Sequence, residues 1–122
     1  MRVLIVQDNQ QLGRIWSRHL QRLGADTTLA DNSDTALQEL QDGTFDVIVL
    51  DLVLRQGGAL TVADFANFNQ PRANVVFVTD TTFFSDGSIF SHSANARAFI
   101  ETATPPKDLA EIVLYYGKKS QA

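Results

Sequence analysis

Acidic and hydroxyl side chains follow three apolar runs of this sequence at the point where each run ends. Asp8 follows the first run after one amide, Gln7; Asp51 directly follows another run; and Thr79 and Asp80 follow a third. Carboxylate oxygens that converge on one point are hard ligands that suit Mg²⁺. With such an ion in place, an Asp becomes a candidate nucleophile towards a phosphoryl donor. These residue types therefore predict a metal-assisted phosphoryl site, provided that the fold brings them together.

Helix capping is the alternative explanation for the same acids. Asp8 or Asn9 could cap a helix that follows the first run, and Asp51 could be solvated. Residue types and spacing alone leave both interpretations open.

The apolar runs themselves predict five short β-strands. Four are continuous and rich in β-branched residues, which is typical of strands covered on both faces by helices. The fifth, residues 27–30, is more polar, as an edge strand is. The other four are residues 3–6, 47–50, 75–78 and 98–100.

Segments with apolar residues at steps of three and four separate the strands and predict helices. They cover residues 12–23, a stretch that follows Ser33 as N-cap, residues 60–68, and a last helix with Thr104 as cap and Pro105 at its first position. Residues 85–95 are rich in Ser and Gly and predict only a short or frayed fourth helix.

Alternating strands and helices predict a doubly wound α/β fold of the flavodoxin-like (βα)5 type, a five-stranded parallel sheet within a three-layer α/β/α sandwich. We expect one domain over residues 1–117 and a C-terminal tail over residues 118–122. In such sheets the ligand crevice lies beyond the carboxyl ends of the strands, which is where the polar residues fall.

Composition excludes several classes of function. The 122 residues carry a net charge of −4 with no run of Lys or Arg, which argues against binding to nucleic acid or to an anionic membrane. The chain has no cysteine, so thiolate catalysis and cysteine metal sites are excluded. No apolar run is long enough to span a membrane and no leader is evident, so we expect a cytoplasmic protein.

Three stretches, VLIVQDN, LADNSDTALQEL and FDVIVLDLVLRQGGAL, resemble the receiver domain of two-component response regulators. The resemblance extends from Met1 to about Gly117 and is strongest from Phe45 to Leu60. It implies a domain that binds Mg²⁺ and accepts a phosphoryl group on an Asp from a histidine kinase.

The resemblance assigns roles to individual residues. Asp51 matches the phosphoacceptor, and Asp8, Asp51 and the backbone carbonyl of Val53 match the metal ligands. Thr79 matches the hydroxyl residue that binds the phosphoryl group, and Phe99 matches the switch aromatic.

Four positions depart from the family pattern. Gln7 replaces an acid and Thr102 replaces the lysine that contacts the phosphoryl oxygens, a charge-assisted contact worth about 1.5–3 kcal/mol. Lys107, in the last helix, is expected to point elsewhere. Arg55 replaces a proline and either compensates in part for the lysine or is solvated. Asp80 replaces a small residue and would repel a phosphoryl group unless it faces solvent or joins the metal ligands.

We therefore predict a receiver-type signalling domain, not an enzyme, with weak Mg²⁺ binding and an impaired site. Its partners would be a histidine kinase or phosphotransfer protein and a downstream protein, with a homodimer as a further assembly. No output domain lies between Gly117 and Ala122, so the readout is expected to be a protein contact, or else an output domain lies outside this sequence. A phosphorylation-independent pseudo-receiver is the alternative. A flavodoxin-like enzyme that binds a nucleotide or flavin is disfavoured, because VQDNQQLG is not a phosphate-binding loop.

Overall fold

Five parallel strands form one sheet in the order β2-β1-β3-β4-β5. The computed structural model describes residues 1–79 and 96–121, without the side chains of residues 96, 97 and 119–121. All five predicted strands are confirmed, and the polar one lies at the sheet edge. The strands are β1 (Arg2–Val6), β2 (Asp26–Ala30), β3 (Val47–Asp51), β4 (Asn74–Thr79) and β5 (Ala96–Glu101).

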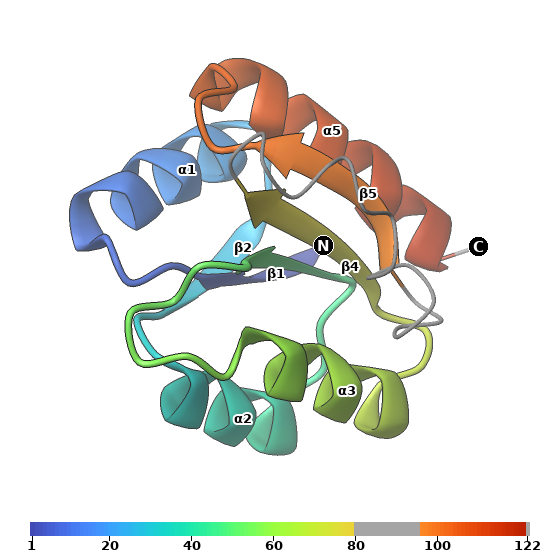
Figure 1. Cartoon of the computed structure of the whole chain (residues 1–122). Helices are drawn as coiled ribbons and strands as arrows, with labels where there is room; N and C mark the ends of the chain where they lie inside the picture. The colour runs from blue at the N-terminus through green and yellow to red at the C-terminus, as the bar shows by residue number, and fades with distance from the viewer. Residues whose placement is uncertain (80–95, 122) are drawn as a thin grey trace.

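Helices cover both faces of this sheet, as the predicted three-layer fold requires (Figure 1). Helices α1 (Gln10–Arg22) and α5 (Pro106–Gln121) lie on one face, and α2 (Ser33–Asp42) and α3 (Ala59–Asn69) lie on the other. The predicted fourth helix, residues 85–95, lies outside the described residues.

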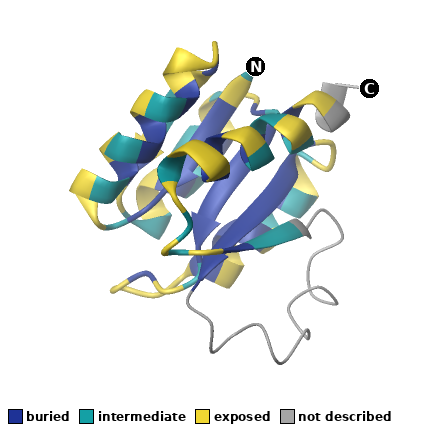
Figure 2. Ribbon diagram, turned by 90° about the horizontal axis from the view of Figure 1, so that it is seen from above, coloured by how far each residue is buried: buried dark blue, intermediate teal, exposed yellow. Residues whose placement is uncertain are grey.

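The strands are buried because helices cover them on both sides, which explains their continuous apolar runs. Every residue of β3 and β4 is buried, and so are four of the five residues of β1 (Figure 2). Trp16 and Leu20 pack on the α1 side of the sheet, whereas Leu40 and Phe77 belong to the cluster on the α2 side. Trp16 is fully buried in its cluster.

Several helix boundaries differ from the prediction. Asn32, not Ser33, is the N-cap of α2, because its side chain accepts the backbone N–H of Thr35 at 2.8 Å. Helix α5 begins at Pro106, one residue later than predicted, and runs on to Gln121.

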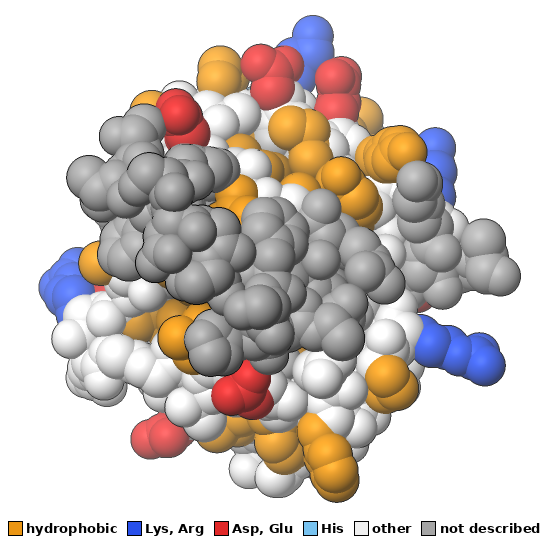
Figure 3. All heavy atoms as spheres, turned by 45° about the vertical axis from the view of Figure 1, so that its right-hand side comes forward, with side chains coloured by type: hydrophobic (Ala, Val, Ile, Leu, Met, Phe, Trp, Pro, Cys, Tyr) orange, Lys and Arg blue, Asp and Glu red, His pale blue; other side chains and the backbone are white. Residues whose placement is uncertain are grey.

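The exposed side of α5 includes Tyr115, which is 49% exposed. Apolar side chains reach the surface on the side of the molecule where β5 and α5 lie (Figure 3).

Among the described helices, none combines the length and the apolar character that a membrane crossing requires.

Candidate functional site

The carboxyl ends of β1 and β3 lie side by side, so the residues at these ends meet. Val6 of β1 pairs with Leu50 of β3, and the next residues are Gln7 and Asp51. Gln7 donates from Nε2 to Oδ2 of Asp51 at 2.8 Å, and both residues are buried. The Gln7 backbone N–H also bonds to the carbonyl of Ala30 at 3.0 Å, which fixes the position of the amide. The residue expected to weaken the site is thus bonded directly to the predicted phosphoacceptor.

The second oxygen of Asp51 is also bonded. Its Oδ1 accepts the backbone N–H of Val53 at 2.8 Å. The preceding N–H, that of Leu52, donates to the carbonyl of Val78 at 2.9 Å, so the chain leaves β3 in a fixed direction. Both oxygens of this buried carboxylate therefore accept hydrogen bonds from the chain itself.

Asp8 contacts the loop after β3 and does not cap α1. Its Oδ2 accepts the backbone N–H of Arg55 at 2.6 Å and lies 3.7 Å from Nε of the same residue. The cap of α1 is Asn9, whose side chain accepts the N–H of Leu12 at 3.1 Å. The capping alternative thus holds for Asn9 but not for Asp8, which is left available for another role.

A tight turn presents Arg55 to Asp8. The N–H of Gly57 donates to the carbonyl of Leu54 at 2.9 Å, which makes Arg55 the second residue of a β-turn. The Arg55 side chain is 81% exposed, so its guanidinium is largely solvated while its backbone N–H is engaged.

Thr79 and Thr102 lie at the ends of β4 and β5. Thr79 is fully buried, and its Oγ1 has no hydrogen-bond partner within the part of the chain that the structure describes. The backbone N–H of Thr102 donates to the Thr79 carbonyl at 2.8 Å, which brings these two residues together. A buried hydroxyl without a partner is rare and calls for an explanation, such as a catalytic role or a bound ion.

The remaining predicted residues are placed as follows. Phe99 is half-buried and stacks on Phe77 with ring centroids 5.2 Å apart. Lys107 is exposed on α5 and lines a hollow with His19, in agreement with the expectation that it points elsewhere. Asp80 lies outside the described residues.

The predicted metal ligands can be compared with the donors that Mg²⁺ needs. Asp8 and Asp51 would supply carboxylate oxygens and Val53 a backbone carbonyl, a donor set that fits Mg²⁺ because this ion needs only one or two carboxylates. Among the described residues, however, no three His, Asp or Glu side chains gather as a metal site, and Gln7 presents an N–H donor to Asp51. The donors therefore fit an ion that is held by few protein charges.

The sequence did not reveal the two contacts that close this site, Gln7 to Asp51 and Arg55 to Asp8. It also did not single out Asp31 and Asn32, which follow β2 as the other acids follow their strands. They line a hollow of about 160 Å³ together with Asp8 and Arg55. The rule that polar residues after strand ends form the site would have included them.

Comparison with known proteins agrees with this architecture. Residues 3–114 match the family model of the response regulator receiver domain. The response regulator receiver protein CpdR of Brucella abortus is 26% identical over 78 residues, a stretch that covers 64% of this chain and 65% of that protein, slightly less than two thirds of its length.

Solved structures show the same fold. A CheY-like receiver domain protein from Methanospirillum hungatei matches with a TM-score of 0.88 at 20% identity, over 98% of this chain and 95% of that chain. The response regulator TrrA of Thermotoga maritima, in complex with Mg²⁺ and a beryllium fluoride, matches with a TM-score of 0.80 at 23% identity, over 94% and 97% of the two chains.

Proposed function

The chain belongs to the family of response regulator receiver domains, and on this premise we propose that it accepts a phosphoryl group on Asp51 and signals through contacts with other proteins. The observation that carries the proposal is the buried hydroxyl of Thr79. It follows the residue that pairs with Asp51 in the sheet, and it has no partner among the described residues. A phosphoryl oxygen beside Asp51 would give this donor the acceptor that it lacks.

The chemical step needs only a nucleophile, an activated donor and charge compensation. A carboxylate oxygen of Asp51 attacks phosphorus, the bond from phosphorus to the donor breaks, and the leaving group takes the electron pair. Asp8, Asp51 and the Val53 carbonyl would hold Mg²⁺, which would offset the repulsion between the carboxylate and the incoming phosphoryl group. The Val53 N–H stabilises charge on the same carboxylate, and the Thr79 hydroxyl donates to the phosphoryl group.

We expect this reaction to be slow and the affinity of the protein for Mg²⁺ to be low. Gln7 brings no charge and Thr102 brings only a hydroxyl. The donor would be a histidine kinase or a phosphotransfer protein, and the output would be a contact with a downstream protein in the cytoplasm, in which Phe99 takes part as the switch aromatic. The domain would act as a signalling module without enzymatic activity of its own.

A pseudo-receiver that acts without phosphorylation is the second candidate. The hydrogen bond from Gln7 to Asp51 favours it, because this bond stabilises the unmodified carboxylate and must break or rearrange when the ion arrives.

Intact-mass spectrometry separates these two functions. The protein is incubated with acetyl phosphate and Mg²⁺, beside the variant Asp51→Ala. We expect the wild type to gain the mass of one phosphoryl group and the variant to gain none. Absence of any adduct on the wild type would favour the pseudo-receiver, and an adduct on both proteins would place the modification elsewhere.

A further inference from the structure

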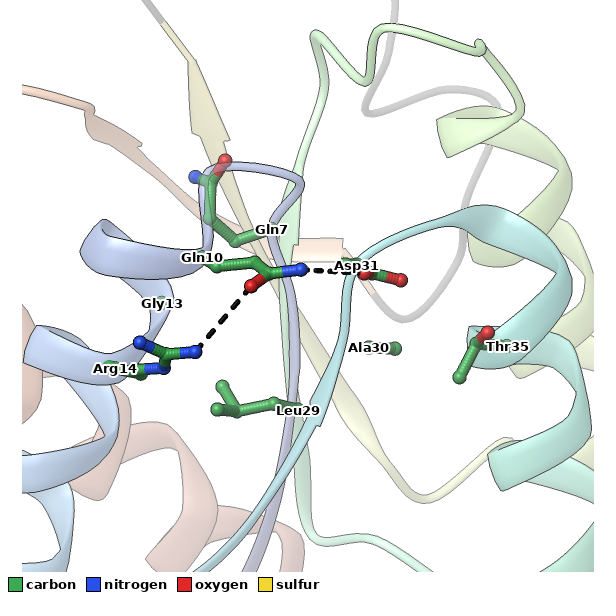
Figure 4. Close-up of a pocket in the computed structure, with 8 residues that line it drawn as sticks. All are labelled: Gln7, Gln10, Gly13, Arg14, Leu29, Ala30, Asp31 and Thr35. Carbon is green, nitrogen blue, oxygen red and sulfur yellow. Dashed lines mark hydrogen bonds between the residues drawn. The ribbon is translucent and has the colours of Figure 1, made fainter.

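A hollow of about 240 Å³ lies between the beginning of α1, the end of the edge strand β2 and the beginning of α2 (Figure 4). Its lining combines one cation, Arg14, and one anion, Asp31, with apolar surface from Leu29 and Ala30. Drug-sized ligands occupy about 300–1,000 Å³, so this hollow suits a smaller molecule. The charges of the lining residues cancel, which favours a ligand that carries one charge of each sign.

The two charges are joined through a neutral amide and not directly (Figure 4). Oε1 of Gln10 accepts a hydrogen bond from Nη2 of Arg14 at 3.5 Å, and Nε2 of Gln10 donates to Oδ2 of Asp31 at 3.1 Å. The first of these bonds is longer than usual. No ion pair joins Arg14 or Asp31 to an opposite charge among the described residues. All three side chains are exposed, so a ligand can displace the amide, which then bonds to water.

Gly13 leaves space on the α1 side of the same hollow. This glycine is buried within the helix, where it costs stability relative to alanine. A Cβ atom at this position would lie 3.5 Å from Cδ2 of Leu29 and 3.6 Å from Cβ of Gln7, which are ordinary van der Waals contacts. Packing therefore does not require glycine here, and the missing methyl group leaves room that a ligand can use.

We propose that this hollow binds a small aliphatic α-amino acid. Its carboxylate would accept hydrogen bonds from Arg14 and its ammonium group would donate to Asp31. These two groups would take the places of the oxygen and the nitrogen of the Gln10 amide. Each contact would then join two opposite charges, which gives a stronger hydrogen bond than a neutral amide does.

The aliphatic side chain of the ligand would cover Leu29, which is 44% exposed, and fill the space beside Gly13. A ligand with a single charge fits less well, because it satisfies either Arg14 or Asp31 and leaves the other without an opposite charge. This inference concerns binding alone and does not depend on phosphorylation of Asp51.

The test is a titration of the isotope-labelled protein with L-leucine, followed by two-dimensional NMR, which detects weak binding and locates it. We expect saturable shifts of the backbone N–H signals of Gly13, Arg14 and Leu29. Isocaproate is leucine without its ammonium group, and isoamylamine is leucine without its carboxylate. Each should bind about fivefold more weakly than L-leucine, because each loses one charge-assisted contact.

Matched variants test the two charged contacts. Arg14→Gln and Asp31→Asn should each weaken the binding of L-leucine by about fivefold. Arg18→Gln and Asp34→Asn remove the same charges from exposed positions that do not line the hollow, and they should leave binding unchanged.

Gly13→Ala tests the space in the hollow. It should weaken the binding of L-leucine by about fivefold or more and also raise the midpoint of urea denaturation, because alanine favours the helix. Loss of binding in this more stable variant cannot come from misfolding. The proposal is overturned if L-leucine causes no saturable shifts, if either single-charge analogue binds as tightly, if Arg14→Gln and Arg18→Gln behave alike, or if Gly13→Ala binds L-leucine as the wild type does.

Discussion

The two sides of the pocket differ in how their polar atoms are satisfied. At the ends of β1 and β3, Asp51 accepts hydrogen bonds from Gln7 and Val53, and Asp8 accepts one from Arg55. At the end of β4, the hydroxyl of Thr79 is buried and has no partner within the described part of the chain. We call these the acid side and the hydroxyl side.

This difference indicates what a ligand must do on each side. A cation on the acid side has to displace or rearrange contacts that already stabilise the carboxylates, so part of its binding free energy is consumed. A phosphoryl oxygen near the hydroxyl side would accept a hydrogen bond from Thr79. Burial of this hydroxyl without a partner already costs folding free energy, so the new bond is favourable. If Asp51 is the phosphoacceptor that we propose, the hydroxyl side stabilises its modified form and the acid side weakens the binding of Mg²⁺.

Gln7→Glu should have the largest effect, because it replaces the hydrogen bond to Asp51 on the acid side with repulsion between two carboxylates. The change replaces a buried donor to Asp51 by a second carboxylate, so without Mg²⁺ the free energy of unfolding should fall by about 1–3 kcal/mol. Saturating Mg²⁺ should restore most of this loss. Urea denaturation with and without Mg²⁺ measures both effects.

The control for this change is Gln11→Glu, which makes the same substitution at an exposed position of α1. It should alter neither the stability nor its dependence on Mg²⁺. Equal behaviour of the two variants would show that the contact between Gln7 and Asp51 does not govern the acid side.

Thr102→Lys should strengthen the hydroxyl side. Thr102 is tied to Thr79 through its backbone, so a lysine here would bring a charged donor to the same end of the sheet. A charge-assisted contact of about 1.5 kcal/mol corresponds to roughly tenfold more phosphorylated protein at steady state with acetyl phosphate. Intact-mass spectrometry measures the fraction. An unchanged fraction would mean that the lysine does not reach the phosphoryl group.

Arg55→Pro and Arg55→Ala should separate the two contacts of Asp8. Proline suits the second position of a β-turn and has no N–H, so it removes both the 2.6 Å hydrogen bond and the ion pair. It should tighten Mg²⁺ binding by about fivefold. Alanine removes only the exposed guanidinium and should change the affinity by less than about twofold. Calorimetric titration with Mg²⁺ measures both; a larger effect of alanine would contradict this account.

Thr79→Val should have the smallest effect on stability. Valine matches the shape of threonine and removes a hydroxyl that has no partner among the described residues, so unfolding should change by less than about 1 kcal/mol or become slightly harder. The control Thr27→Val removes a hydroxyl that bonds to Ser17 at 2.6 Å and should cost about 1 kcal/mol. Urea denaturation of both variants tests the comparison, and a greater loss for Thr79→Val would mean that its hydroxyl is bonded.

The fold was predictable from the sequence because the strands are buried on both faces and therefore read as continuous apolar runs. The positions of Asp8, Asp51 and Thr79 followed from the same pattern, since each lies at or just after the end of a strand. The contacts among them did not follow from it. Whether Gln7 donates to Asp51, and whether Arg55 turns towards Asp8, depends on the path of the loop after β3, and residue types alone do not specify that path. Similarly, Asn32 and Ser33 are both good caps, and only the backbone decides between them.

The most direct test is a crystal structure of this protein grown with Mg²⁺ and beryllofluoride, a stable mimic of the phosphoryl group. We predict a beryllofluoride adduct on the carboxylate of Asp51, with Thr79 Oγ1 as a donor to fluoride and with the bond from Gln7 to Asp51 broken or lengthened. A structure without the adduct, in which Gln7 still donates to Asp51 and Thr79 is still without a partner, would contradict the proposal that Asp51 is a phosphoacceptor.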